Sequence, residues 1–194
     1  MTPVARDELI ILRHAQADHG GRLCGRTDVS ACLPQVQTIQ FLRHLLDGSS
    51  VVASPARRCR ETATAIFKDI EIRQDERLWE QDFGVDEGKR FEDLPDLGPL
   101  PLNALARHAA QDGESFLDMV ERVKPALLEY ADRARKAGPI ILVAHAGTAR
   151  AALGLALDQP ESGLKFEINP LSITRLRCLD NAFSIIATNE QVVS

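Results

Sequence analysis

The sequence predicts a single α/β domain over residues 1–194, built on a mostly parallel sheet, and three short apolar runs carry this prediction. Residues 9–12, 51–53 and 140–144 are continuously apolar, which is typical of strands buried on both faces of a parallel sheet. A chain of 194 residues is long enough for one such domain with a full core. Polar residues follow soon after each run, so we expect the carboxyl ends of these strands to meet at a binding site.

The remaining elements follow from apolar periodicity and from turn residues. Helices are expected over four segments: 34–46, 55–67, 116–136 and 149–157. A short strand at 70–73 and a hairpin formed by 172–178 and 184–188 complete the expected sheet. The buried side of the third helix is expected to consist of Phe116, Met119, Val120, Val123, Leu127, Leu128 and Tyr130.

Composition and charge limit the classes of partner. The formal net charge of −5 argues against a general affinity for nucleic acid or for an anionic membrane surface, because both need an excess of Lys and Arg. The apolar runs fall far short of the roughly 18 residues that a membrane span needs, and residues 1–8 lack the apolar stretch of a signal peptide. We therefore expect a cytoplasmic protein with a small-molecule partner, and a homodimer is left open.

The cysteine and histidine spacings favour neither a disulfide framework nor a metal site. The cysteines at 24, 32, 59 and 178 show no C-x-x-C spacing, and the histidines at 14, 19, 44, 108 and 145 show no H-x-x-x-H or H-E-x-x-H spacing. We expect free thiols and no structural zinc.

Three predicted strand ends bring basic and imidazole side chains to one edge of the sheet. Arg13 and His14 end the first run, Arg58 follows the second, and His145 follows the third. An imidazole held neutral at one nitrogen can attack phosphorus, and Arg13, Arg58 and His145 can balance the charge of the phosphoryl oxygens. His145 can do so protonated, as a cation, or neutral, as a hydrogen-bond donor. The pattern favours phosphoryl-transfer chemistry.

Glu80 is the candidate proton donor for a leaving alkoxide. It stands beside Trp79 and near Phe83, and burial against aromatic rings would keep a carboxylic acid protonated near neutral pH. Taken alone, each of these residues has an ordinary structural explanation, such as a solvated helix arginine or a surface carboxylate. The remaining histidines, His19, His44 and His108, have no comparable placement, so we assign them no role.

The same residues carry a resemblance that covers nearly the whole chain. Residues 12–15, L-R-H-A, resemble the R-H-G signature of the histidine phosphatase superfamily, also called phosphoglycerate mutase-like. Four further segments resemble blocks of that family in the same order. Residues 54–63, S-P-A-R-R-C-R-E-T-A, resemble the family's S-P-L-x-R-A-x-Q-T-A, and residues 78–80, L-W-E, with 84–88, G-V-D-E-G, resemble its L-x-E and G-x-W-E-G. Residues 113–115, G-E-S, and 143–147, V-A-H-A-G, match the last two blocks.

The resemblance implies an αβα sandwich and a metal-independent phosphatase without a cofactor, acting on a small phosphorylated metabolite. It implies that His14 forms a phosphohistidine, that Arg13, Arg58 and His145 bind the phosphoryl group, and that Glu80 donates the proton. Four residues depart from the family pattern: Ala15 replaces the glycine of R-H-G, Gln16 and Ala17 replace common Glu and Ser or Thr, and Gly20 stands near a phosphate-contacting Asn.

The physiological substrate is left among several candidates. Residues 24–29, C-G-R-T-D-V, resemble a loop of bacterial α-ribazole phosphatases, so α-ribazole 5′-phosphate is one of them. A broad-range sugar phosphatase, a phosphohistidine-protein phosphatase, a mutase and a binding module without turnover are the alternatives. The chain is too short for the large insertion of mutases, so hydrolysis is favoured. We expect substrate contacts from Gln16, Gly25, Arg26, Thr27 and Ala146.

Overall fold

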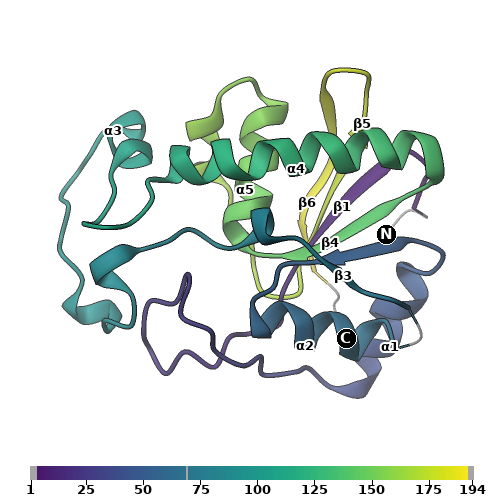
Figure 1. The fold of residues 1–194 in the computed structure, drawn as a ribbon, viewed down its shortest axis with the longest axis horizontal. Helices are drawn as coiled ribbons and strands as arrows, with labels where there is room; N and C mark the ends of the chain where they lie inside the picture. The colour runs from purple at the N-terminus through teal and green to yellow at the C-terminus, as the bar shows by residue number, and fades with distance from the viewer. Residues whose placement is uncertain (1–3, 69, 192–194) are drawn as a thin grey trace.

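The computed structural model describes residues 4–68 and 70–191, whose centre is a six-stranded sheet with the order β3-β2-β4-β1-β5-β6 (Figure 1). The strands are β1 (Glu8–Arg13), β2 (Ser50–Ala53), β3 (Arg73–Gln74), β4 (Ile140–Ala144), β5 (Ile173–Cys178) and β6 (Phe183–Glu190). Strands β1 to β4 run parallel to one another, and β5 pairs antiparallel with both β1 and β6. The predicted mostly parallel sheet is confirmed, as is the closing hairpin.

Helices cover both faces of the sheet. Figure 1 shows α1 (Val36–Leu45) and α2 (Arg57–Ile66) on one side, and α4 (Phe116–Ala137) and α5 (Ala146–Ala156) on the other. The short helix α3 (Leu102–Arg107) and four 3-10 turns fill the connections: Glu76–Leu78, Gly84–Asp86, Phe91–Asp93 and Pro160–Lys165. This is the expected three-layer αβα sandwich. Within the described ranges, every helix is too short or too polar to cross a membrane.

The alternating side chains of the central strands explain the continuous apolar runs in the sequence. Leu9 and Ile11 of β1 belong to the core under α4 and α5, whereas Ile10 and Leu12 belong to the core under α1 and α2. All four are at most 1% exposed. Because both faces are covered, a polar residue in the strand needs a buried partner, as Glu8 has in Arg175 at 2.8 Å.

Some boundaries differ from the predictions for local reasons. Leu128, expected on the buried side of α4, is 46% exposed, because Leu127 beside it on the helix takes the core position. Helix α5 begins at Ala146, three residues earlier than expected, and His145 is its N-cap residue. Strand β3 is Arg73–Gln74, so only Arg73 of the strand expected at 70–73 belongs to it.

The sheet order places the site. Because β2, β4 and β1 are neighbours and parallel, the residues that follow them lie side by side at one edge. The N–H of His14 donates to the carbonyl of Ala144 at 2.9 Å, and that of Ser54 donates to the carbonyl of Val143 at 3.0 Å. These bonds continue the hydrogen bonding of the sheet beyond the ends of β1 and β2. The backbone at His14 and Ser54 is therefore held in place.

Candidate active site

The ring of His14 is held in one tautomer by two contacts. Its Nδ1 lies 2.6 Å from the carbonyl oxygen of Ala15, which can only accept, so Nδ1 carries the proton. Its Nε2 then has the free lone pair, and it accepts a hydrogen bond from Nε of Arg58 at 3.3 Å. Burial, aided by the charges of Arg58 and Arg13, lowers the pKa of His14 to about 3. His14 is therefore a neutral imidazole whose Nε2 can act as a nucleophile.

Arg58 is fixed by four contacts although it is only 1% exposed. Besides His14, its guanidinium donates to the carbonyls of Gly25 at 2.7 Å and Thr27 at 3.2 Å, and Nη2 lies 3.3 Å from Nδ1 of His145. A cation in the first turn of α2 opposes the helix dipole. The two carbonyls offset that cost and hold the charge beside the nucleophile.

His145 is neutral as well and lies behind the nucleophile. Its ring is completely buried, with its centroid 5.2 Å from that of His14 and the two planes at 69°. Burial and the charge of Arg58 lower its pKa well below the usual range. Since Nδ1 faces the guanidinium of Arg58, Nε2 carries the proton and donates to Oγ of Ser54 at 2.9 Å. Of the two protonation states left open by the sequence, the structure favours the neutral one.

Arg13 completes the set of positive groups. It ends β1, and its Nη1 donates to the carbonyl of Ile168 at 2.5 Å. Its Nε is buried and has no hydrogen-bond partner within the described part of the chain. Burial lowers its pKa, but an arginine remains a cation at neutral pH. This side chain therefore has donor capacity for an oxyanion.

Glu80 meets the amino end of α5. Its Oε2 accepts from the N–H of Gly147 at 3.3 Å, and its Oε1 accepts from the N–H of Gln81 at 3.0 Å. A Cβ on Gly147 would lie 2.1 Å from Oε1 of Glu80, so a larger residue here would displace the carboxylate from the helix end.

The aromatic residues Trp79 and Phe83 also contact the loop around residues 25–26. The indole N–H of Trp79 donates to Glu76 at 2.9 Å, and the guanidinium of Arg26 stacks on the Trp79 ring at 5.4 Å. The ring of Phe83 lies against Gly25. Both rings thus support the loop around residues 25–26.

A hollow of about 170 Å³ lies at this edge of the sheet, and we call it the site hollow. It is lined by Arg13, His14, Gln16, Ala17, His19, Arg22, Leu23, Cys24, Arg58, Glu80 and Phe91. Four of the five proposed chemical residues line it, and His145 stands behind them. His19, to which no role was assigned from the sequence, also lines it, with its ring edge-on to Phe91 and the centroids 5.3 Å apart. A role for His19 was not predictable from spacing because it lies in a loop.

Of the expected substrate-contacting residues, Gln16 lines the site hollow and the others lie outside its lining. The Nε2 of Gln16 is 3.1 Å from Nε2 of His19. Ala146 is half-buried in the first turn of α5. A second hydrogen-bond network, centred on Glu87, holds residues 25–27 in place.

Residues 25–27 form a loop fastened from both sides. Their carbonyls hold Arg58, and their N–H groups converge on the carboxylate of Glu87 at distances of 2.7 to 3.1 Å. The hydroxyl of Thr27 donates to the same carboxylate at 2.6 Å. Burial would raise the pKa of Glu87, but the hydroxyl and N–H donors outweigh it and lower the pKa. The loop therefore positions Arg58, and Glu87 is poorly suited to donate a proton.

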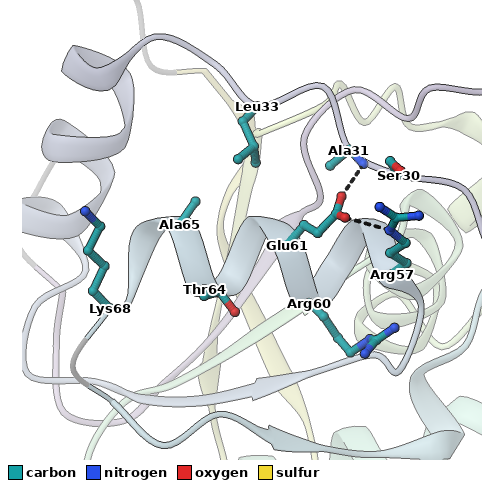
Figure 2. A pocket seen from close by; sticks show the side chains of 9 residues that line it. All are labelled: Ser30, Ala31, Leu33, Arg57, Arg60, Glu61, Thr64, Ala65 and Lys68. Carbon is teal, nitrogen blue, oxygen red and sulfur yellow. Dashed lines mark hydrogen bonds and ion pairs between the residues drawn. The ribbon is translucent and has the colours of Figure 1, made fainter.

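The neighbouring loop is fastened to the outer face of α2. Figure 2 shows Glu61 between the N–H of Ala31 and the guanidinium of Arg57, each at 2.7 Å. The N–H of Ala31, together with Arg57, lowers the pKa of Glu61. This face also carries a hollow of about 880 Å³. It is an open surface depression, and its lining contains none of the five proposed chemical residues, so we place the chemistry in the smaller site hollow.

The described residues include no cluster of three or more His, Cys, Asp or Glu side chains placed to hold a metal ion. The chemical groups of the site are instead two neutral imidazoles, the buried arginine Arg58, the half-buried arginine Arg13 and one carboxylate. Such a set can bind a dianion, attack it with an imidazole nitrogen and transfer a proton.

The chain belongs to the histidine phosphatase superfamily (branch 1), whose family model matches residues 9–191. A 6-phosphofructo-2-kinase/fructose-2,6-bisphosphatase of Caenorhabditis elegans is 26% identical over 172 residues. That match covers 84% of this chain but only 37% of the length of the curated relative.

Solved structures share the fold over nearly the whole chain. A mycobacterial glucosyl-3-phosphoglycerate phosphatase in complex with VO3 has a TM-score of 0.79 and 24% identity, covering 95% of this chain and 99% of its own. A phosphoserine phosphatase of Entamoeba histolytica in complex with 3-phosphoglyceric acid has a TM-score of 0.79 and 22% identity, covering 95% and 97%. The family and its fold are thus shown, and phosphatase activity fits both.

Proposed function

We propose that this protein is a metal-independent phosphomonoester hydrolase that works through a phosphohistidine on His14. The observation that carries the proposal is the tautomer of His14: Nδ1–H donates to Ala15, which leaves Nε2 as a nucleophile beside a buried guanidinium. Arg13 and Arg58 supply the positive charge that a phosphoryl dianion needs, so the chemistry requires no divalent cation.

In the first step, Nε2 of His14 attacks phosphorus in line with the leaving oxygen. The new N–P bond forms as the ester P–O bond breaks, and the protonated carboxyl of Glu80 gives its proton to the departing alkoxide. Arg13 and Arg58 bind the phosphoryl oxygens through this step. His145 packs behind the ring and faces the guanidinium of Arg58.

In the second step, the Glu80 carboxylate accepts a proton from water. The water oxygen attacks phosphorus, the N–P bond breaks, and inorganic phosphate leaves with the electron pair returned to Nε2. Glu80 ends the cycle protonated, as it began.

The site hollow favours a small phosphorylated metabolite as substrate. At about 170 Å³ it has room for a phosphoryl group and a few further atoms, and a larger ester such as α-ribazole 5′-phosphate would extend beyond it. Arg22 lines the hollow, donates to the carbonyl of Gly88, and forms no ion pair among the described residues. A second anionic group on the substrate would match that charge. The two phosphatases similar in fold are named for glucosyl-3-phosphoglycerate and phosphoserine, which both carry a carboxylate.

The test is a panel of phosphate esters that includes phosphoserine, 3-phosphoglycerate, sugar phosphates, a phosphohistidine peptide and α-ribazole 5′-phosphate. We expect release of inorganic phosphate, fastest with a small ester. Transfer of phosphate between hydroxyls without release would assign a mutase, and binding without turnover of any ester would assign a binding module.

A further inference from the structure

Arg122, in the second turn of α4, makes a set of contacts that has no place in the reaction as described so far. Its Nη1 donates to the carbonyls of Arg77 at 2.9 Å and Trp79 at 3.0 Å, and its Nη2 donates to the carbonyl of Glu80 at 3.1 Å. Its Nε and Nη2 each donate to the carboxylate of Glu114 at 2.7 Å. A guanidinium has five N–H donors, so all of them are used.

These bonds join the rigid start of α4 to the segment that carries the proposed proton donor. Ser115 and Asp118 form a capping box at this end of the helix, so the element behind Arg122 is well fixed. The segment from 77 to 80 has only the short turn Glu76–Leu78 as regular structure. Three of its carbonyls are held by one side chain, and the last of them belongs to Glu80 itself.

The carboxylate of Glu80 depends on that support because its own contacts are few. It accepts one N–H from the adjacent Gln81 and one, at 3.3 Å, from Gly147. Neither bond restrains the backbone from which the side chain starts. Glu114 is committed to Arg122 as well: burial would raise its pKa, but the bonds from Arg122 outweigh burial and lower it.

We propose that Arg122, oriented by Glu114, is a positioning residue that holds the backbone of Glu80 so that its carboxyl reaches the leaving oxygen. The inference rests on the proposed function of Glu80. Lysine cannot replace this arginine, because an ammonium has three donors at one point and cannot reach three carbonyls and a carboxylate together.

The experiment measures phosphoryl transfer in single turnovers with two substrates, an alkyl phosphate and p-nitrophenyl phosphate. An alkoxide needs the proton of Glu80 to leave, whereas a nitrophenolate does not. Since a displacement of about 1 Å can cost on the order of 10²-fold, Arg122→Lys should lose about that factor with the alkyl phosphate and far less with p-nitrophenyl phosphate. In the Glu80→Gln background, Arg122→Lys should cause no further loss of rate that differs between the two substrates.

Controls separate this inference from the proposed function. Arg135→Gln removes another α4 arginine, one that pairs with Asp132, and should leave both rates unchanged. Equal losses with both substrates, or a full additional loss in the Glu80→Gln background, would reduce Arg122 to a purely structural residue and overturn the inference. If Glu80→Gln alone slows both substrates equally, it is the proton-donor assignment that fails. Should Arg122→Lys not fold, Glu114→Gln gives the same readout.

Discussion

The Nε of Arg58 donates to the Nε2 of His14 across 3.3 Å, so the lone pair assigned to the nucleophile is occupied by a cation in the resting protein. A bound phosphoryl dianion would compete for that guanidinium and release the lone pair where it is needed. Under the proposed function, this contact would couple substrate binding to activation of the nucleophile.

This coupling predicts that Arg58→Lys is severely impaired although the charge is kept. A lysine cannot bond to His14, Gly25 and the phosphoryl oxygens from one planar group. Removing one preorganised donor of this kind costs on the order of 10²- to 10³-fold in kcat. Steady-state kinetics with a small phosphate ester measures this, and Arg60→Lys on the exposed face of α2 is the matched control. A loss of less than a few-fold in Arg58→Lys would contradict the assignment.

The pKa of His14 predicts how stability changes with acid. His14 has a pKa of about 3 when folded and near 6.5 when unfolded, so between these values the unfolded chain binds more protons. Stability must then fall as pH is lowered from about 6.5 toward 3, and His14 contributes about 2 kcal/mol of that loss by pH 5. Urea unfolding at about pH 7.5 and pH 5 should show a smaller loss for His14→Asn than for the wild type. An identical loss would show that His14 is not buried as a neutral base.

Glu80→Gln should divide substrates by their leaving group. With an alkyl phosphate the loss in phosphoryl-transfer rate should be on the order of 10² to 10⁴, the usual range for general acid catalysis. With p-nitrophenyl phosphate it should be much smaller. Single-turnover rates measure both, and equal losses would mean that Glu80 acts in positioning or charge balance. Glu87 and Glu114 are weak replacements, because their carboxylates are occupied by residues 25–27 and by Arg122.

Chelation should leave turnover intact, because Arg13 and Arg58 provide the positive charge at the site hollow. Dialysis against EDTA followed by assay with and without added Mg²⁺ or Zn²⁺ checks this. A loss of activity that either ion restores would show that a cation belongs to the site.

The sequence was most informative where function depends on strand ends. His14 and His145 follow strands whose burial makes them easy to find, and parallel neighbours must deliver their next residues to one edge. The roles of Arg122 and Glu87 could not be found this way, because each depends on backbone groups more than 40 residues away along the chain. Apolar spacing also failed to choose between Leu127 and Leu128, since adjacent residues on α4 share an edge of the buried face. The tautomers of the two histidines depend on Ala15 and Ser54, contacts that spacing alone does not show.

The most direct test of the account is to trap the phosphoryl group on His14. Substrate labelled in its phosphate should be mixed rapidly with enzyme and quenched without acid, because a phosphohistidine is stable in alkali and labile in acid. We expect acid-labile label on the wild type, located to His14 by peptide mapping, and none on His14→Ala. Equal labelling of His14→Ala, or rapid turnover by that variant, would contradict the central claim.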